Sequence, residues 1–280
     1  MDAQDKSEQV TLVVRLSYNG RAYSGFAKQK DPTVHTIQGE LEHALATLFR
    51  HPVETVCAGR TDAGVHALDQ TVSVKLDVPE LSSREPRKIV TSLNALTPDD
   101  ISITGVGFAA PEFSARFDAV CRVYRYRIVM GGAPPLFTRE FAWWHRAPLN
   151  VAGMQQAAHL LEGEHDFKSF CKAASAEGKS TCRHVESIEF FEENVLGERC
   201  VTMQIVGNAF LHSMVRTIMG TLVQVGAGRR QPTWVQDVLD ARDRQAAGEN
   251  APARGLTFWH VEYPPRAIAS TLEEVLQMRP

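Results

Sequence analysis

The chain has 280 residues, 44% of them hydrophobic and 22% charged, which is the composition of a soluble globular protein with room for two domains. No apolar run approaches the roughly 18 residues that a membrane span needs, and the stretch Met1–Lys6 is too polar for a signal peptide, so we expect a cytoplasmic protein. The formal net charge of −3 argues against binding to nucleic acid by bulk charge, so any polyanionic partner must meet a local basic patch.

The five cysteines, at positions 57, 121, 171, 182 and 200, are an odd number and include no C-x-x-C pair. This pattern supports neither a disulfide framework nor a zinc ribbon. The nearest approach to a metal cluster is Cys171, Cys182 and His184, which lack a fourth partner at ligand spacing. The sequence therefore predicts free thiols and no metal site.

The first 110 residues predict the order strand, helix, strand, strand, helix, strand. In the first helix, apolar residues recur at helical spacing and Thr36 stands at the N-cap position. The strands are expected over 10–17, 53–57, 70–78 and 101–108, and the helices over 37–50 and 86–96.

The second half repeats this order with one extra helix. We expect strands over 117–129, 183–192, 200–207 and 256–263, helices over 151–161, 210–225 and 234–241, an exposed polar loop over 242–254, and a surface tail or short helix after Pro264. The repeat suggests an α+β protein built from two ferredoxin-like βαββαβ units, over 1–112 and 113–280. Their antiparallel or mixed sheets would join, with helices on the faces and a cleft between the units.

Between the strands 53–57 and 70–78 lies the segment Cys57–His66, which reads CAGRTDAGVH. Its glycines allow a sharp turn and the close approach of another molecule, and Asp62 would sit at a strand end, where a rigid scaffold can present chemistry. The alternative is an Asx turn, in which the Asp62 carboxylate only caps its own backbone. Spacing alone favours that alternative.

Along the segment Cys121–Arg127, side-chain alternation in a strand places Arg122, Tyr124 and Tyr126 on one face. Such a face can hold single-stranded RNA bases on its aromatic rings. Spacing alone favours the alternative, which is an ordinary cross-strand aromatic pair with solvated arginines. Farther along, Asn208–Gly220 is apolar on nearly all sides, so Arg216 within it needs an anionic partner. By itself this predicts a structural salt bridge. His212 reads as a core histidine and not as a base.

Three motifs in the same order resemble those of the TruA-type tRNA pseudouridine synthases. Gly59–His66 matches the central motif of that family at eight consecutive residues, Phe113–Phe117 with Tyr124–Tyr126 resembles its second motif, and Asn208–Gly220 resembles its third. The likeness extends from about Val10 to Tyr263. It is only partial at Gly25–Gln29, where the family loop usually reads Gly-Trp-Gln-x-Gln and this chain has Phe26 and Ala27.

The resemblance implies an isomerase that converts uridine to pseudouridine at positions 38, 39 and 40 in the anticodon stem-loop of tRNA. It assigns catalysis to Asp62, its cationic partner to Arg216, and stacking on the uracil to Tyr124, with Tyr126 as the fallback. Arg60 would help to extrude the target uridine. The reaction needs no redox cofactor, nucleotide or metal.

The resemblance also implies a homodimer in which one tRNA touches both subunits. Two other functions stay open on the residues alone. One is a non-catalytic tRNA-binding or folding protein of the same architecture, and the other is a hydrolase that uses Asp62 as its nucleophile.

Overall fold

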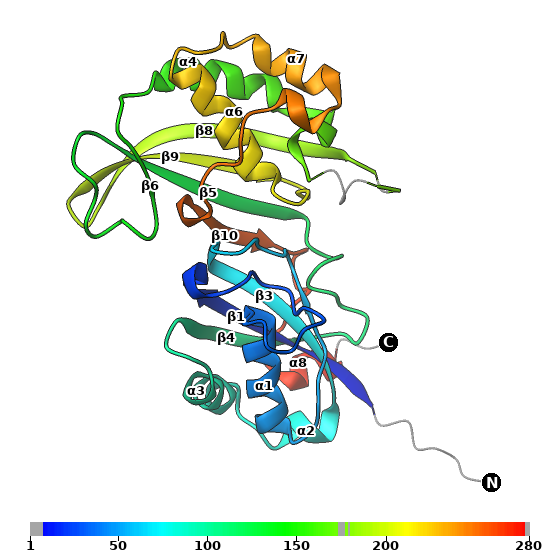
Figure 1. The fold of residues 1–280 in the computed structure, drawn as a ribbon. Coiled ribbons are helices and arrows are strands. Elements are labelled where there is room, and N and C mark those ends of the chain that lie inside the picture. Colours follow the sequence, from blue (N-terminus) through cyan, green and yellow to red (C-terminus); the bar gives the residue numbers. More distant parts are fainter. Residues whose placement is uncertain (1–7, 173–176, 179, 278–280) are drawn as a thin grey trace. The chain divides into compact units, whose positions relative to one another are not determined.

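The computed structural model describes residues 8–172, 177–178 and 180–277, and its contacts divide the chain into two compact units (Figure 1). Unit 1 comprises Met1–Ala63, Ala67–Val120 and Val261–Pro280. Unit 2 comprises Gly64–His66 and Cys121–His260. The polar stretch Met1–Lys6 lies outside the described residues.

The division differs from the expected boundary after residue 112, because residues 113–120 and the C-terminal segment both pack on unit 1. The Tyr263 hydroxyl donates to the Ala115 carbonyl at 2.7 Å, and the Val120 amide donates to the Glu262 carbonyl at 2.9 Å. Buried apolar side chains of Val13 and Phe113 pack with Tyr263 in the same cluster. Unit 1 is therefore completed by residues from both ends of the chain.

Unit 1 contains a four-stranded antiparallel sheet in the order β4-β1-β3-β2. Helix α1 packs beside α3, which lies against β4. The strands are β1 (Gln9–Tyr18), β2 (Thr55–Cys57), β3 (His66–Asp77) and β4 (Ile101–Ala109), and the helices are α1 (Ile37–Phe49), α2 (Val78–Ser82), α3 (Pro86–Leu96) and α8 (Leu272–Gln277), with a 3-10 turn at Gly20–Ala22.

Unit 2 contains the strand order β10-β5-β9-β8-β7, with β6 paired in parallel to β5. Helices α4, α6 and α7 pack together, and α4 lies on β8. The strands are β5 (Cys121–Met130), β6 (Trp143–His145), β7 (Gly163–Asp166), β8 (Cys182–Val195), β9 (Glu198–Gly207) and β10 (Leu256–Glu262), the helices are α4 (Val151–Ala158), α6 (Met214–Gly226) and α7 (Trp234–Ala241), and the 3-10 turns are His159–Leu161, Phe167–Phe170, Arg244–Ala246 and Ala253–Gly255.

Both units have the same topology. In unit 1, the four strands of the βαββαβ order lie side by side in the spatial order fourth, first, third, second, that is β4-β1-β3-β2. In unit 2, the strands β10, β5, β9 and β8 repeat that arrangement, with β6 and β7 as additions that the sequence analysis did not anticipate. The predicted α+β class with two ferredoxin-like units is therefore confirmed.

Helix α1 shows how local sequence sets these elements. The Thr36 hydroxyl accepts a hydrogen bond from the Gly39 amide at 3.2 Å, which caps the first turn, and the helix stops at Arg50 in the left-handed region at φ 65°. Between these ends Leu41 and Leu45 are fully buried. The helix is thus core packing, as its periodicity predicts.

Unit 2 differs from expectation at the start of α6 and over the segment 242–254. The helix expected from Phe210 begins only at Met214, because Ser213 adopts a left-handed conformation at φ 61° that interrupts the helical path. The segment 242–254 is not simply an exposed loop, since Ala251 is only 2% exposed and part of the segment packs against α6. Of the described helices, none has the length and apolar character needed to cross a bilayer.

Candidate active site

Asp62 lies half-buried on the connection between β2 and β3 in unit 1, and Arg60 is exposed on the same connection. The connection is held closely by the preceding loop. The Phe26 amide donates to the Thr61 carbonyl at 3.0 Å, and a Cβ at Gly25 would lie 2.9 Å from that same oxygen. Gly25 also has φ +101°, so only glycine fits this position without strain. The partial family match at Gly25–Gln29 therefore marks a support for the Asp62 loop.

Phe26 itself is fully buried and its ring lies 6.1 Å from that of Tyr18. This placement makes Phe26 a core residue beneath the loop. The family pattern has tryptophan where this chain has Phe26. This difference changes core packing, but the hydrogen bond from the backbone amide of residue 26 to the Thr61 carbonyl stays in place.

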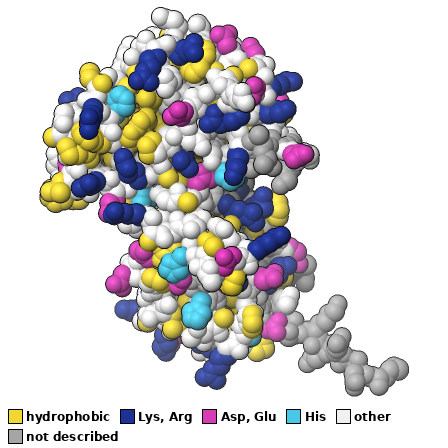
Figure 2. Space-filling view, in the orientation of Figure 1, with side chains coloured by type: hydrophobic (Ala, Val, Ile, Leu, Met, Phe, Trp, Pro, Cys, Tyr) yellow, Lys and Arg dark blue, Asp and Glu magenta, His cyan; other side chains and the backbone are white. Residues whose placement is uncertain are grey.

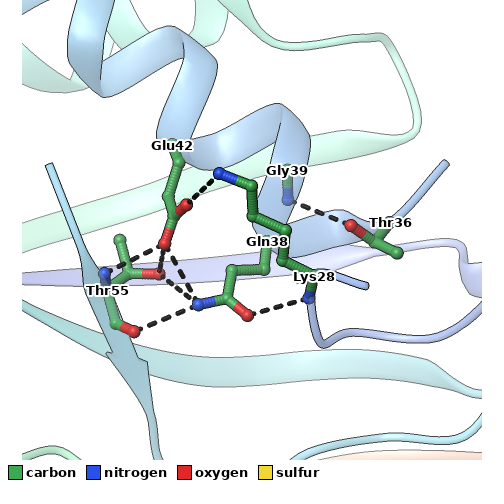
Figure 3. Close-up of polar contacts among 6 residues, drawn as sticks. All are labelled: Lys28, Thr36, Gln38, Gly39, Glu42 and Thr55. Atoms are coloured by element: carbon green, nitrogen blue, oxygen red, sulfur yellow. Dashed lines mark hydrogen bonds and ion pairs between the residues drawn. The ribbon is translucent and has the colours of Figure 1, made fainter. Parts of the chain in front are cut away.

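A polar network fixes the loop that carries Phe26 (Figure 3). The Glu42 carboxylate, on α1, accepts from the Thr55 amide at 3.0 Å, the Thr55 hydroxyl at 2.9 Å and the Lys28 ammonium at 3.1 Å. Gln38 donates to Glu42 and accepts from the Lys28 amide at 3.0 Å. Because Glu42 is 9% exposed and has several donors, its charge is compensated in the folded unit.

Tyr124 lies on β5 of unit 2 and is 7% exposed. Its ring makes edge-to-face contacts with Phe210 at 5.1 Å and with Phe258 at 5.0 Å, so its orientation is set by packing on two sides. As predicted, Arg122, Tyr124 and Tyr126 share one face, because all three are buried while the residues between them are half-buried.

Tyr126 is not available as the fallback. Its side chain is fully buried, its hydroxyl donates to the Pro252 carbonyl at 2.7 Å, and a Cβ at Gly255 would lie 2.5 Å from its ring. Burial also raises the pKa of the Tyr126 phenol, so this group stays protonated. Tyr126 is a structural residue of unit 2.

Arg216 is half-buried in the first turn of α6. Its Nε donates to the Ala251 carbonyl at 2.8 Å, and the Ala251 amide donates to the Arg216 carbonyl at 3.0 Å. The segment around Ala251 thus orients Arg216, a role that the sequence analysis missed. His212, expected in the core, is exposed. The pairing of Arg216 with Asp62 joins residues of different units and stays a prediction.

His66 closes the GRTDAGVH motif and packs within unit 2. It is 2% exposed, its Nε2 lies 2.9 Å from the Glu140 carbonyl, and its ring contacts that of Phe141 at 4.7 Å. Burial lowers the pKa of His66 to about 4, so the imidazole is neutral at physiological pH. A neutral, packed ring is suited to structure and not to proton donation.

Charge is distributed unevenly between the units. Residues 121–260 hold 16 Lys and Arg against 14 Asp and Glu, whereas the rest of the chain holds 14 against 19. Figure 2 shows Lys and Arg side chains spread over the visible face of unit 2. A polyanion would therefore be attracted more strongly to unit 2. Among the described residues, no group of three or more His, Cys, Asp or Glu side chains is placed to hold a metal ion.

A family model and several individual proteins similar to this chain all point to the same family. The family model described as tRNA pseudouridine synthase matches residues 16–118 and 157–264. The chain is 41% identical to a tRNA pseudouridine synthase A of Methylococcus capsulatus, over 90% of this chain and 89% of that protein. It is 39% identical to that of Pseudomonas aeruginosa, over 90% and 85%, and 38% identical to that of Alcanivorax borkumensis, over 90% and 91%.

Proposed function

Because this chain belongs to the tRNA pseudouridine synthase family, we propose that it converts uridine to pseudouridine at positions 38, 39 and 40 of the tRNA anticodon stem-loop. The observation that carries the proposal is the family match, which covers most of both units. Asp62 lies on a loop that hydrogen bonds to the preceding part of unit 1 hold in place.

In this reaction the bond between N1 and C1′ breaks, the uracil turns, and C5 bonds to C1′. The hydrogen at C5 is lost, and N1 ends with a proton, so the reaction is an isomerisation. The target base is stacked in the RNA and must be flipped out before a protein group can reach its sugar. The ionised Asp62 carboxylate then acts on the ribose, as nucleophile or as base.

Three further residues complete the proposed site. Arg216 stabilises the ionised Asp62 as its cationic partner. Tyr124 stacks on the detached uracil, a role that the fixed orientation of its packed ring supports. Its hydroxyl oxygen takes the C5 proton. Arg60 occupies the gap that the flipped base leaves, which its exposed position on the Asp62 loop supports.

The proposal includes a cytoplasmic homodimer in which one tRNA contacts both subunits. With an overall charge of −3, one copy has limited electrostatic attraction for tRNA. A dimer would bring two sets of basic side chains to the same tRNA. Size measurement with and without tRNA tests this part separately from catalysis.

The test of catalysis is release of tritium from C5-labelled uridine in unmodified tRNA, with no cofactor added. We expect release by the wild-type protein and none by Asp62→Asn, which keeps the side-chain shape but removes its charge. Binding of tRNA by Asp62→Asn should stay within about twofold, because phosphate contacts supply most of the RNA affinity.

Asp69→Asn is the matched control, since it removes a carboxylate that pairs with Arg15 on the surface of unit 1 at 2.6 Å. It should keep wild-type activity. Wild-type protein that binds tRNA without releasing tritium would be a non-catalytic tRNA-binding protein, and release of free uracil would identify a hydrolase. Normal tritium release by Asp62→Asn would remove Asp62 from the mechanism.

A further inference from the structure

Two buried polar side chains of unit 1 lie beneath the Asp62 loop and take no part in the chemistry proposed above. Gln70, on β3, is fully buried, and Tyr18, at the end of β1, is 4% exposed. Buried amide and phenol groups are costly unless hydrogen-bonded, so their partners show what they stabilise. Both have partners in the Asp62 loop.

Gln70 holds Gly59 from two directions. Its Nε2 donates to the Gly59 carbonyl at 2.7 Å, and its Oε1 accepts from the Gly59 amide at 3.3 Å. The side-chain amide thus binds the backbone as a neighbouring strand would, at the point where β2 has ended and the loop begins. One residue earlier, the Ala58 amide donates to the Thr71 carbonyl at 2.8 Å and continues the pairing.

Tyr18 carries this support forward to the residue beside Asp62. Its hydroxyl shares a hydrogen bond of 2.8 Å with the Thr61 hydroxyl and accepts a longer one, of 3.5 Å, from Gln70 Nε2. Thr61 is 8% exposed, and its carbonyl is held by the Phe26 amide. The backbone on the N-terminal side of Asp62 is therefore fixed at Gly59 and again at Thr61.

From these contacts we infer that Gln70 and Tyr18 are positioning residues, which set the place of the Asp62 carboxylate and so control the rate of the chemical step. The inference rests on the proposed function, since it assumes that Asp62 is the catalytic group. A loop that includes Gly59 and Gly64 has little intrinsic stiffness, so its geometry must come from outside contacts. A displacement of about 1 Å at a reacting group can lower a rate by about 10²-fold.

The first test uses Tyr18→Phe, which keeps the ring in the core and removes only the hydroxyl. Single-turnover tritium release with saturating enzyme should slow by about 10- to 100-fold, while the dissociation constant for tRNA stays within about twofold. Ser73→Ala is the matched control. It removes a buried hydroxyl from β3, the strand that pairs with β1, where Ser73 bonds to Val56 and Ala115 and not to the Asp62 loop. It should lose stability to a similar extent and keep its rate.

The second test uses the pH profile of Gln70→Glu. An ionised carboxylate can accept from the Gly59 amide but cannot donate to the Gly59 carbonyl, whereas the protonated form regains the donor. Burial raises the pKa of a carboxyl group, so the rate of this variant relative to wild type should increase several-fold as the pH falls from about 8 to about 5.5. Melting temperatures at each pH separate this effect from unfolding.

The outcomes distinguish failure of the proposed function from failure of the positioning role of Gln70 and Tyr18. If the wild-type protein releases no tritium, the proposed function fails. If the wild type is active and Asp62→Asn is not, but folded Tyr18→Phe keeps the wild-type rate and Gln70→Glu shows the wild-type pH profile, the positioning role is overturned and the proposed function stands. Slowing of Ser73→Ala to the same degree as Tyr18→Phe would also overturn it, since the effect would then follow stability alone.

Discussion

Replacement of Gly220 by alanine should destabilise unit 2 and disturb Arg216. A Cβ at Gly220 would lie 1.7 Å from the Glu249 carbonyl oxygen, whereas real contacts of this kind are not found below 3.0 Å. The two backbones must therefore separate by about 1.3 Å, which is more than a closely packed core absorbs without loss. The helix α6 and the segment 248–251 have no flexible side chain at this contact to give way.

The size of the effect follows from the contacts at risk. If the segment stays in place, overpacking costs about 1 to 3 kcal/mol. If it moves, three hydrogen bonds are weakened, at about 1 kcal/mol each. They are the bond from Arg216 Nε to the Ala251 carbonyl, the bond from the Ala251 amide to the Arg216 carbonyl, and the bond of 3.0 Å from the Gly248 amide to the Thr221 hydroxyl. Either response gives a loss of about 1 to 3 kcal/mol in the free energy of unfolding.

Urea denaturation followed by circular dichroism measures this loss, with Gly132→Ala as the matched control, because a Cβ at Gly132 would meet nothing within 4 Å. Tritium release from tRNA reports on Arg216 in the same variants. If Gly220→Ala unfolds at the wild-type urea concentration and reacts at the wild-type rate, the close packing of segment 248–251 on α6 does not have the role argued above.

Three further predictions concern other contacts. Tyr124→Phe should bind tRNA normally and turn over about 10²- to 10⁴-fold more slowly, while Tyr124→Leu should also lose about 1 to 3 kcal/mol of stacking; full activity of the Phe variant would remove the proton-accepting role. Arg216→Met should fold without activity, whereas Arg216→Ala should in addition lose about 2 kcal/mol in denaturant melts, and activity in both would show that Arg216 is not the partner of Asp62. The Thr138 hydroxyl and three backbone amides lower the pKa of Glu198 to about 2 from 4.5. The ionised Glu198 therefore contributes fully to stability above about pH 4.5, and this contribution disappears as the pH falls towards 2. Acid unfolding of Glu198→Gln should lack that part of the pH dependence, and acid unfolding curves identical to those of the wild type would contradict the prediction.

Local sequence predicts most of the elements in this chain. Helices α3 and α7 occur over the expected residues, because apolar periodicity with clear ends is a local property. The alternation of Tyr124 and Tyr126 with half-buried residues is also as expected. The start of α6 was misplaced because apolar composition continues back to Phe210, and the conformation of Ser213 that stops the helix has no local signal.

The candidate site was less accessible to such reasoning. Asp62 and Arg60 were identified because the motif around them is short and contiguous. Gln70 was overlooked, because a single polar residue within a strand has no distinctive pattern. Its position could have identified it, since a polar side chain on a buried strand directly after the motif is unusual. The support of Arg216 by Ala251 depends on close packing between residues 35 positions apart, and no periodicity reports such a contact.

The return of the chain to unit 1 after His260 has a consequence for how the protein is made. Synthesis proceeds at about 5 to 20 residues per second, so the 140 residues of Cys121–His260 separate the two parts of unit 1 by roughly 7 to 28 seconds. During that interval Phe113 and Val13 lack the Tyr263 ring and its neighbours, which cover them in the finished protein. A nascent chain halted near residue 260 would thus display an uncovered apolar edge of unit 1 to the chaperones at the ribosome.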